Sequence, residues 1–184
     1  MYTLGEWGAL GDTIFTNWRV ENIPPDAPGE TRMGLDFGFA QDPCGFVRLR
    51  YDRKRRKIYV LEELYQKGLT NLSLAERLRP YPGPIACDSA EPKSIAEMRE
   101  YGVAAIGARK GPDSVYYGIK WMQDLEEIII DPKRCPETAR EFSSYEYESD
   151  GRGGWRAAFP DRDNHAIDAV RYSREEDMRH IRVR

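Results

Sequence analysis

Three aspartates occupy positions where a globular protein normally avoids carboxylates. Asp36 falls inside a predicted strand, Asp88 at the end of another, and Asp168 within the last predicted helix. Burying an ionised carboxylate without a compensating charge costs several kcal/mol, so each acid needs a partner. The same segments hold too few bases to pair with all three. A hard divalent cation such as Mg²⁺ or Mn²⁺, which prefers oxygen ligands, would compensate them.

Small residues share a strand face with the first two acids. Gly34 and Gly38 stand two residues to either side of Asp36, and Ala86 stands two residues before Asp88. Because alternate residues of a strand point to the same face, these positions surround the carboxylates. We interpret them as an open floor on which a cation and a bulky ligand can approach.

A histidine accompanies the third acid. His165 precedes Asp168 by three residues, which places both side chains on one face of a helix. A neutral imidazole there could orient a water or a metal-bound hydroxide, and a protonated one could contact phosphate. The alternative is a histidine at a helix start whose hydrogen bonds are satisfied by its neighbours.

Each acid also has a purely structural alternative. Asp36 could accept hydrogen bonds from backbone N–H groups in a tight turn, and Asp88 could cap the helix that follows it. Asp168 could form an ion pair with Arg171 or Arg162. All three acids being structural is the less favoured interpretation.

The elements that must position these residues define the fold class. Three strands in succession, joined by short connections, predict an antiparallel meander, and strands then alternate with helices. The expected strands are 32–40, 46–51, 58–65, 84–89, 103–108 and 128–130, and the expected helices are 73–78, 92–101, 115–125, 136–145 and 164–178. This order predicts an α/β fold with a mixed sheet and helices on both faces.

Charge and composition narrow the function classes. The chain has 184 residues, 28 Lys and Arg against 31 Asp and Glu, and a net charge of −3, which excludes a polybasic binder. Residues 1–30 carry a net charge of −4 and end in a Pro-rich stretch, so we predict a linker or remnant there. The predicted domain is 31–178, followed by a basic tail over 179–184.

Three widely spaced cysteines and two histidines give no zinc-finger pattern, and reduced thiols are expected. No apolar stretch approaches the length of a membrane span, so no membrane partner is expected. The region 48–57 is strongly basic, but the topology puts its turn at the far end of the sheet from Asp36, where a solvated hairpin tip is favoured over a remote DNA contact. Arg109 and Lys110 follow a strand at the same end as Asp88 and are better candidates for phosphate contacts.

Four ordered segments resemble the nuclease domain of tailed-phage terminase large subunits, a domain with a ribonuclease H-like fold. They are Gly34-Leu-Asp-Phe-Gly-Phe-Ala, Ala86-Cys-Asp-Ser-Ala-Glu-Pro-Lys-Ser-Ile, Ala108-Arg-Lys-Gly-Pro-Asp-Ser-Val and Asp163-Asn-His-Ala-Ile-Asp-Ala-Val-Arg-Tyr. The resemblance runs from about residue 4 to residue 177, and Gly5-Glu6-Trp7-Gly8 is similar to the family's connection to its ATPase domain. It implies that Asp36, Asp88 and Asp168 bind metal. The Gly-Lys-Ser/Thr phosphate loop of that ATPase domain has no counterpart here.

The resemblance implies a metal-dependent endonuclease that cuts concatemeric double-stranded viral DNA during genome packaging, with weak sequence preference. Partners implied for a full-length protein are an ATPase domain, a small terminase subunit and the capsid portal, in the cytoplasm of an infected bacterium. The alternatives are a nuclease resembling Holliday-junction resolvases or transposases and a non-catalytic portal or DNA docking module. A sugar or acetate kinase shares the sheet topology, but it needs phosphate loops that this chain lacks.

Phosphodiester hydrolysis by two divalent cations, Mg²⁺ or Mn²⁺, is the expected chemistry. We expect Asp36 to bridge both ions, Asp88 and Asp168 each to favour one, and His165 to tune the second site. Glu62 and Glu63 are alternative acids, ranked lower because a strand separates theirs from that of Asp36.

Overall fold

A seven-stranded mixed sheet organises the fold of the computed structural model, which describes residues 12–38, 41–175 and 177. Its strands are β1 (Trp18–Val20), β2 (Glu30–Asp36), β3 (Cys44–Asp52), β4 (Lys57–Gln66), β5 (Ile85–Cys87), β6 (Ala105–Gly107) and β7 (Glu127–Ile130). The spatial order is β1-β7-β4-β3-β2-β5-β6, in which β2, β3 and β4 pair antiparallel and the other pairs are parallel. The predicted mixed sheet is confirmed.

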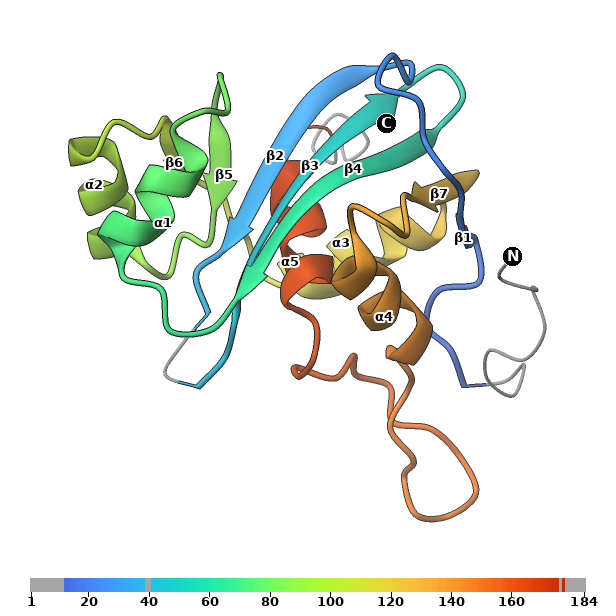
Figure 1. The fold of residues 1–184 in the computed structure, drawn as a ribbon. Helices are drawn as coiled ribbons and strands as arrows, with labels where there is room; N and C mark the ends of the chain where they lie inside the picture. The colour runs from blue at the N-terminus through green and yellow to red at the C-terminus, as the bar shows by residue number, and fades with distance from the viewer. Residues whose placement is uncertain (1–11, 39–40, 176, 178–184) are drawn as a thin grey trace.

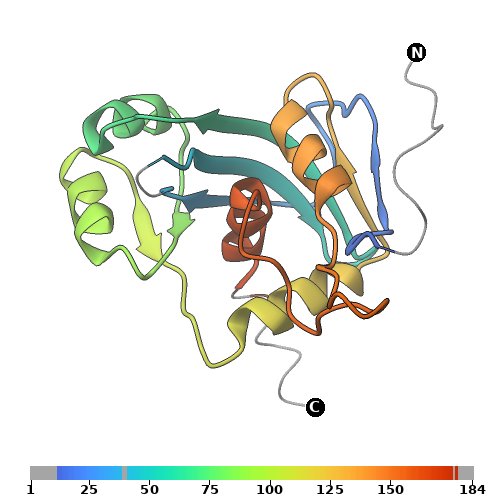
Figure 2. The same cartoon turned by 90° about the horizontal axis from the view of Figure 1, so that it is seen from below.

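Helices cover both faces of this sheet (Figure 1 and Figure 2). They are α1 (Asn71–Leu78), α2 (Pro92–Glu100), α3 (Ser114–Gln123), α4 (Pro136–Ser144) and α5 (His165–Ser173). One core joins α3, α4 and α5 to β3, β4 and β7, and another joins α1 and α2 to β2, β5 and β6. On β3, Val47 belongs to the first core and its neighbour Phe46 to the second, which is the period of two expected for a strand buried on both faces.

The first meander strand ends earlier than the sequence pattern predicts. β2 ends at Asp36, whereas the alternation of apolar residues predicts a strand to residue 40. The backbone turns at Gly38, whose φ of +67° is costly for other residues and whose N–H donates to Oδ1 of Asp36 at 3.3 Å. Asp36 therefore lies at the carboxyl end of its strand, not in the middle.

The segment before the meander belongs to the sheet and its core in the part that the structure describes. β1 pairs parallel with β7, and Ile14 and Phe15 are buried beneath α4. Ile23 and Ala27 pack on the opposite face of β4 and β7. Residues 13–27 are thus built into the fold rather than forming a free linker. Residues 1–11, with the predicted connection at Gly5–Gly8, and the tail 179–184 lie outside the described residues.

The basic hairpin tip lies at the end of the sheet opposite to Asp36. Asp36 pairs with Gly45, whereas the turn between β3 and β4 follows the pair Asp52–Lys57 seven residues along β3. Several of its bases form ion pairs with nearby acids: Arg48 with Glu62, Arg53 with Asp177, Arg55 with Asp52 and Lys57 with Glu127. The predicted placement of this tip is confirmed.

The three cysteines are buried and free. Burial raises the pKa of the Cys87 thiol to about 12. Among the described residues, no helix has the length and apolar character needed to cross a bilayer.

Candidate metal and nucleic-acid site

Two of the three aspartates meet because their strands are parallel neighbours. Gly34 pairs with Ala86 and Leu35 with Cys87, so the residues that follow, Asp36 and Asp88, emerge at the same edge of the sheet. The N–H of Asp88 donates to the carbonyl oxygen of Leu35 at 3.2 Å. Ligand sites of α/β sheets form at this carboxyl edge.

The third aspartate is brought in by α5, which lies on β2 and β3. A Cβ atom added at Gly34 would stand 1.8 Å from the carbonyl oxygen of Ala169, and one at Gly45 would stand 2.7 Å from that of His165. The absence of a side chain at these two glycines therefore allows the backbone of α5 to pack directly against the sheet. The interpretation of Gly34 as an open floor for a ligand is wrong, because α5 fills that space.

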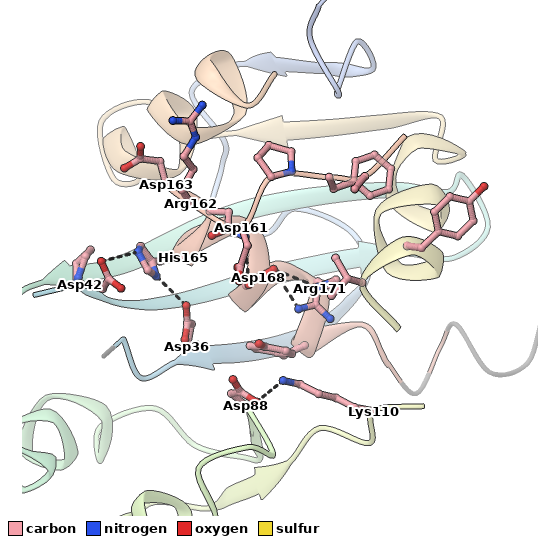
Figure 3. Close-up of a pocket in the computed structure, with 18 of the residues that line it drawn as sticks. Asp36, Asp42, Asp88, Lys110, Asp161, Arg162, Asp163, His165, Asp168 and Arg171 are labelled. Carbon is pink, nitrogen blue, oxygen red and sulfur yellow. Dashed lines mark hydrogen bonds and ion pairs between the residues drawn. The ribbon is translucent and has the colours of Figure 1, made fainter. Parts of the chain in front are cut away.

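The three acids line one pocket of about 1060 Å³ together with His165 and Lys110 (Figure 3). Its charged lining residues are Asp36, Asp42, Asp88, Asp113, Asp161, Asp163, Asp168, Lys67, Lys110, Arg140, Arg162, Arg171 and His165. Seven aspartates against five Lys and Arg leave the lining acidic. A polyanion could enter such a pocket only after cations had reduced its negative charge.

Asp36 is paired with His165. Oδ2 of Asp36 lies 2.9 Å from Nδ1 of His165, and the two side chains are 17% and 14% exposed. This hydrogen bond and the charge of Asp36 raise the pKa of His165 against the effect of burial. Nε2 of the same imidazole lies 3.9 Å from Oδ1 of Asp42, so carboxylates flank the ring at both nitrogens.

Asp88 is paired with Lys110, which reaches it from the loop after β6. The Nζ atom of Lys110 and the N–H of Ala90, the latter at 2.8 Å, both donate to Oδ1 of Asp88. Burial alone would raise the pKa of Asp88, but these donors lower it below its usual value. The side chain is ionised at neutral pH.

Asp168 is paired within its own helix. Nη2 and Nε of Arg171 lie 3.1 and 3.2 Å from Oδ1 of Asp168, and Nδ2 of Asn164 lies 3.4 Å from Oδ2. Burial nevertheless raises the pKa of Asp168 to about 6, and the charge of Asp36 acts in the same direction against Arg171. This carboxylate is therefore under-compensated by its protein neighbours.

Each acid has a protein partner although the segments that carry the acids hold too few bases for all three, because Lys110 comes from another segment. Lys110, Arg171 and His165 supply one partner each, two of them from the very segments that carry acids. The contacts of two structural alternatives also occur, a turn N–H on Asp36 and Arg171 on Asp168. The third does not: Asp88 accepts from Ala90, which lies before α2, and the N-cap residue of that helix is Glu91. Among the residues that the structure describes, no group of three acids, histidines or cysteines is assembled as a metal cage.

The pocket gathers most of the predicted site residues. Asp36, Asp88, Asp168, His165 and Lys110 all line it, and their roles stay predictions. Arg109 is exposed and is not part of the described lining.

The two lower-ranked acids are engaged elsewhere. Glu62 forms an ion pair with Arg48, and Glu63 accepts hydrogen bonds from the first turn of α4. Their low rank agrees with these contacts and with the strand β3 that separates β4 from β2.

Three tyrosines that line the pocket, Tyr65, Tyr116 and Tyr172, were not predicted as site residues. Tyr172 follows Asp168 by four residues, a helical spacing that could have placed it on the same face. Tyr65 lies at the end of β4, where no local pattern indicates a role.

The strand order, the meander and the three acids around α5 define a ribonuclease H-like domain. Solved large terminases have this architecture: the nuclease domain of phage P22 matches with a TM-score of 0.69 at 18% identity, covering 92% of this chain and 97% of that one. The large terminase of the thermophilic bacteriophage D6E matches with a TM-score of 0.66 at 21% identity, covering 88% of this chain and 44% of that one. The predicted fold class is confirmed.

The chain belongs to the family of terminase RNase H-like domains, whose model matches residues 36–176. It is 40% identical over 186 residues to the terminase large subunit of Bacillus phage SPP1, covering 96% of this chain and 44% of that protein. The crystal structure of the SPP1 large-terminase nuclease domain with bound Mn matches with a TM-score of 0.83 at 39% identity, covering 89% of this chain and 98% of that one. The PBSX phage terminase large subunit of Bacillus subtilis (strain 168) is 33% identical over 145 residues, which are 77% of this chain and 33% of that protein. The chain thus spans less than half the length of the curated relatives it matches.

Proposed function

We propose that this domain is a metal-dependent endonuclease that cuts double-stranded DNA during phage genome packaging, with weak sequence preference. The observation that carries the proposal is the convergence of Asp36, Asp88 and Asp168, from three separate elements, on one pocket. Its likeness to an SPP1 nuclease domain with bound Mn supports the same chemistry.

The donor set fits hard divalent cations. Carboxylate oxygens are the ligands that Mg²⁺ and Mn²⁺ prefer, and the raised pKa of Asp168 marks a charge that the protein itself compensates poorly. We propose that Asp36, Asp88 and Asp168 hold two such ions, with Asp36 shared between them. When bound, the ions would activate a water and stabilise the leaving oxygen of a phosphodiester. A cation bound at Asp88 would stand beside the ammonium group of Lys110, and the repulsion between the two charges would weaken the Lys110–Asp88 pair.

His165 has a proton-handling role in this proposal. The hydrogen bond between its Nδ1 and Asp36 fixes the orientation of the ring. The other nitrogen, Nε2, then faces Asp42. An imidazole with a raised pKa can hold a proton near neutral pH and donate it to a developing oxyanion. This assigns His165 a catalytic role and leaves the cation ligands to the aspartates.

Four exposed bases on the pocket rim fit a nucleic-acid backbone. Lys67, Lys110, Arg140 and Arg162 line the pocket, and their side chains can contact phosphates on either side of the acids. Arg109, exposed beside Lys110, would add a contact on the same flank. In a full-length protein we propose that an ATPase domain, a small terminase subunit and the capsid portal deliver the DNA, in the cytoplasm of the infected host.

The test is cleavage of supercoiled plasmid DNA in the presence of Mn²⁺ or Mg²⁺. Chelating the cation with EDTA should stop the reaction. Asp36→Asn should abolish cleavage, whereas Asp26→Asn, which changes an exposed acid that is not part of the described pocket lining, should cut like the parent. Cleavage that survives Asp36→Asn would refute the site.

A non-catalytic docking module is the second candidate, favoured by one observation. Each acid already has a protein cation or imidazole partner, as a neutralised, inactive site would. A pure preparation that binds DNA but never cuts it with any divalent ion would establish this alternative. Faster cutting of four-way junctions than of linear duplex would instead indicate a resolvase-like nuclease.

A further inference from the structure

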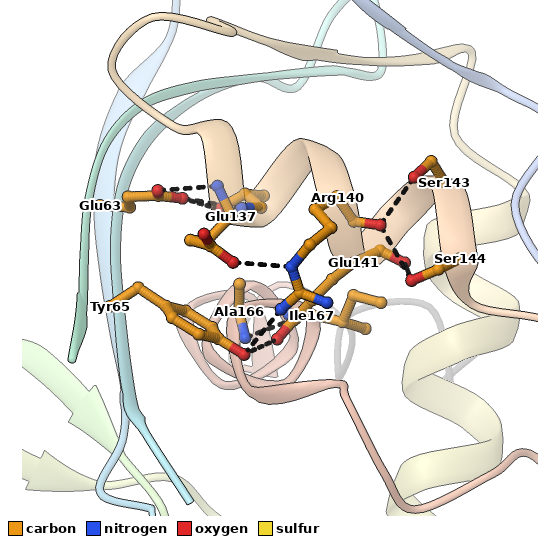
Figure 4. Close-up of polar contacts among 10 residues, drawn as sticks. Glu63, Tyr65, Glu137, Arg140, Glu141, Ser143, Ser144, Ala166 and Ile167 are labelled. Atoms are coloured by element: carbon orange, nitrogen blue, oxygen red, sulfur yellow. Dashed lines mark hydrogen bonds and ion pairs between the residues drawn. The ribbon is translucent and has the colours of Figure 1, made fainter. Parts of the chain in front are cut away.

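Two carboxylates cap the N-termini of two consecutive helices, and each carboxylate belongs to a different element from the helix that it caps (Figure 4). Glu63 of β4 accepts from the N–H groups of Glu137 and Thr138, at 2.9 and 2.8 Å, at the start of α4. Glu141, on α4, accepts with Oε2 from the N–H groups of Ala166 and Ile167, at 2.7 and 3.0 Å, at the start of α5. Each of the two helices thus has its N-terminus capped by a carboxylate from another element.

The first turn of α5 depends on this outside carboxylate. The first N–H groups of a helix have no partners within the helix, and burying them unsatisfied is costly. Asn164, which precedes α5, makes no capping hydrogen bond with its side chain. Glu141 is fully buried and supplies the missing acceptor, and its negative charge stands at the positive end of the helix dipole.

The two anchored residues lie between the two site residues of the helix. Ala166 and Ile167 are flanked directly by His165 and Asp168, so fixing their backbone fixes the direction in which both site side chains leave the helix. The other oxygen of Glu141 accepts from the hydroxyl of Tyr65 at 2.7 Å, which ties the same carboxylate to the end of β4.

We propose that Glu141 is a positioning residue that sets the first turn of α5 and thereby aims His165 and Asp168 at Asp36. The proposal rests on the proposed function where it concerns cation binding. Glu141 is not among the described residues lining the pocket, so it acts through the helix rather than on a ligand. Burial raises its pKa, but four hydrogen-bonded and charged neighbours lower it in part, namely Tyr65, Ile167, His165 and Ala166.

The experiment compares Glu141 with Glu63, which caps the start of α4, a helix that carries neither His165 nor Asp168. Glu141→Ala removes the acceptor, and Glu141→Gln keeps one oxygen that can reach both N–H groups. Glu63→Ala is the matched control, since it removes an equivalent cap from α4. Amide hydrogen exchange of Ala166 and Ile167, followed by NMR, reports the first turn directly, and Mn²⁺ binding is measured by electron paramagnetic resonance.

In Glu141→Ala we expect both amides to exchange about tenfold faster or more, as the loss of a hydrogen bond to a charged group implies. Mn²⁺ affinity should fall by a similar factor, with partial recovery of both in Glu141→Gln. Glu63→Ala should leave both readings within about twofold of the parent. If Glu141→Ala does not fold, Glu141→Gln against Glu63→Gln gives the same comparison with smaller shifts.

Unchanged exchange at Ala166 and Ile167 in the Glu141 variants would overturn the proposal, as would equal effects from the Glu63 variants. Faster exchange with parental Mn²⁺ affinity would also overturn it, because the turn would then not aim the site. A parent that binds no Mn²⁺ would refute the proposed function instead, and the exchange rates alone would then decide the role of Glu141.

Discussion

The carboxylate of Asp168 and the guanidinium of Arg171 lie 3.1 Å apart within one turn of α5, and their side chains are only 13% and 3% exposed. This pair does not restore an ordinary acidity to the carboxyl group, since burial raises the pKa of Asp168 to about 6. The ionised form of Asp168 is therefore a cost to the folded domain that an added cation would relieve.

That cost should appear as a pH dependence of stability. The folded-state pKa of Asp168 lies above its unfolded value near 3.9, so between about pH 4 and pH 6 the folded state binds more protons and loses stability as pH rises. Asp168→Asn removes this titration. In EDTA, the free energy of unfolding of Asp168→Asn minus that of the parent should increase between pH 4 and pH 7.5, by about 3 kcal/mol at most.

Urea denaturation at several pH values measures this difference. The unpaired Arg171 adds a constant penalty in Asp168→Asn, so the slope with pH is informative and the absolute value is not. A flat difference for Asp168→Asn would mean that the acid titrates normally.

The site acids could be found from the sequence because a carboxylate among apolar residues is a local signal. Asp36, Asp88 and Asp168 each violate the burial pattern of their own segment, and the parallel strand order then places the first two at one edge. The partner of Asp168 could also be found, since Arg171 follows it by three residues, but the partner of Asp88 could not. Lys110 reaches Asp88 across a loop 22 residues later, a contact that only the packed fold creates.

The short strand β1 escaped prediction for a similar reason. Trp18–Val20 pairs with β7 about 110 residues away, and three residues within an acidic segment carry no periodicity of their own. Gly34 was interpreted as space for a ligand because a sequence does not show which element packs over a strand. Its true neighbour is the backbone of α5.

Gly34→Ala should therefore be severely destabilising. The new Cβ atom would stand 1.8 Å from the carbonyl oxygen of Ala169, so α5 must move away from β2. Overpacking of this kind typically costs about 1–3 kcal/mol, and a clash between two backbones belongs at or above the upper end. Urea denaturation of the purified variant and of the parent measures this decrease in the free energy of unfolding.

Gly107→Ala is the control for the glycine substitution. Gly107 also lies in a strand of this sheet, but its added Cβ would meet only Ser89 and Ile95 at ordinary contact distances of 3.5 and 3.6 Å. Its effect should stay within about 1 kcal/mol. Equal effects of the two substitutions would show that α5 does not need the close approach.

Asp177→Asn should also destabilise the domain, because three arginines converge on this one buried acid. Arg174 is fully buried, with Cζ 3.7 Å from the centre of the Tyr51 ring. Its Nη2 atom lies 2.5 Å from Oδ2 of Asp177. Arg53 and Arg32 approach the same carboxylate at 2.7 and 3.3 Å. Removing its charge leaves a buried cation uncompensated, which costs about 3–5 kcal/mol.

Glu148→Gln provides the exposed counterpart in the same denaturation assay. Glu148 contacts Arg156 and Arg162, at 3.4 and 3.7 Å, and both arginines are mostly exposed. Because solvent screens such exposed ion pairs, each contributes less than about 1 kcal/mol to the free energy of unfolding. A loss for Asp177→Asn no larger than that for Glu148→Gln would mean that the cluster around Arg174 is not anchored by Asp177.

The strength of DNA binding should depend on Lys110 and not on the basic hairpin tip. In the proposed function a cation at Asp88 weakens the Lys110–Asp88 pair, which frees the ammonium group of Lys110 for phosphate. Each phosphate contact adds about one to the slope of log affinity against log salt, so Lys110→Ala should lower that slope by about 1. Lys54→Ala, at the exposed tip at the other end of the sheet, should leave the slope unchanged.

Fluorescence anisotropy of a labelled duplex, titrated with protein at several NaCl concentrations and one fixed Ca²⁺ concentration, measures both slopes. Ca²⁺ takes oxygen ligands and so can occupy the acids, and a gel of the same samples verifies that the duplex stays intact. The same loss from both variants would mean that DNA runs along the whole sheet and that the hairpin is a second contact. A loss from Lys54→Ala alone would place the duplex away from the pocket. That result is incompatible with cleavage at Asp36, because the hairpin turn and Asp36 lie at opposite ends of β3.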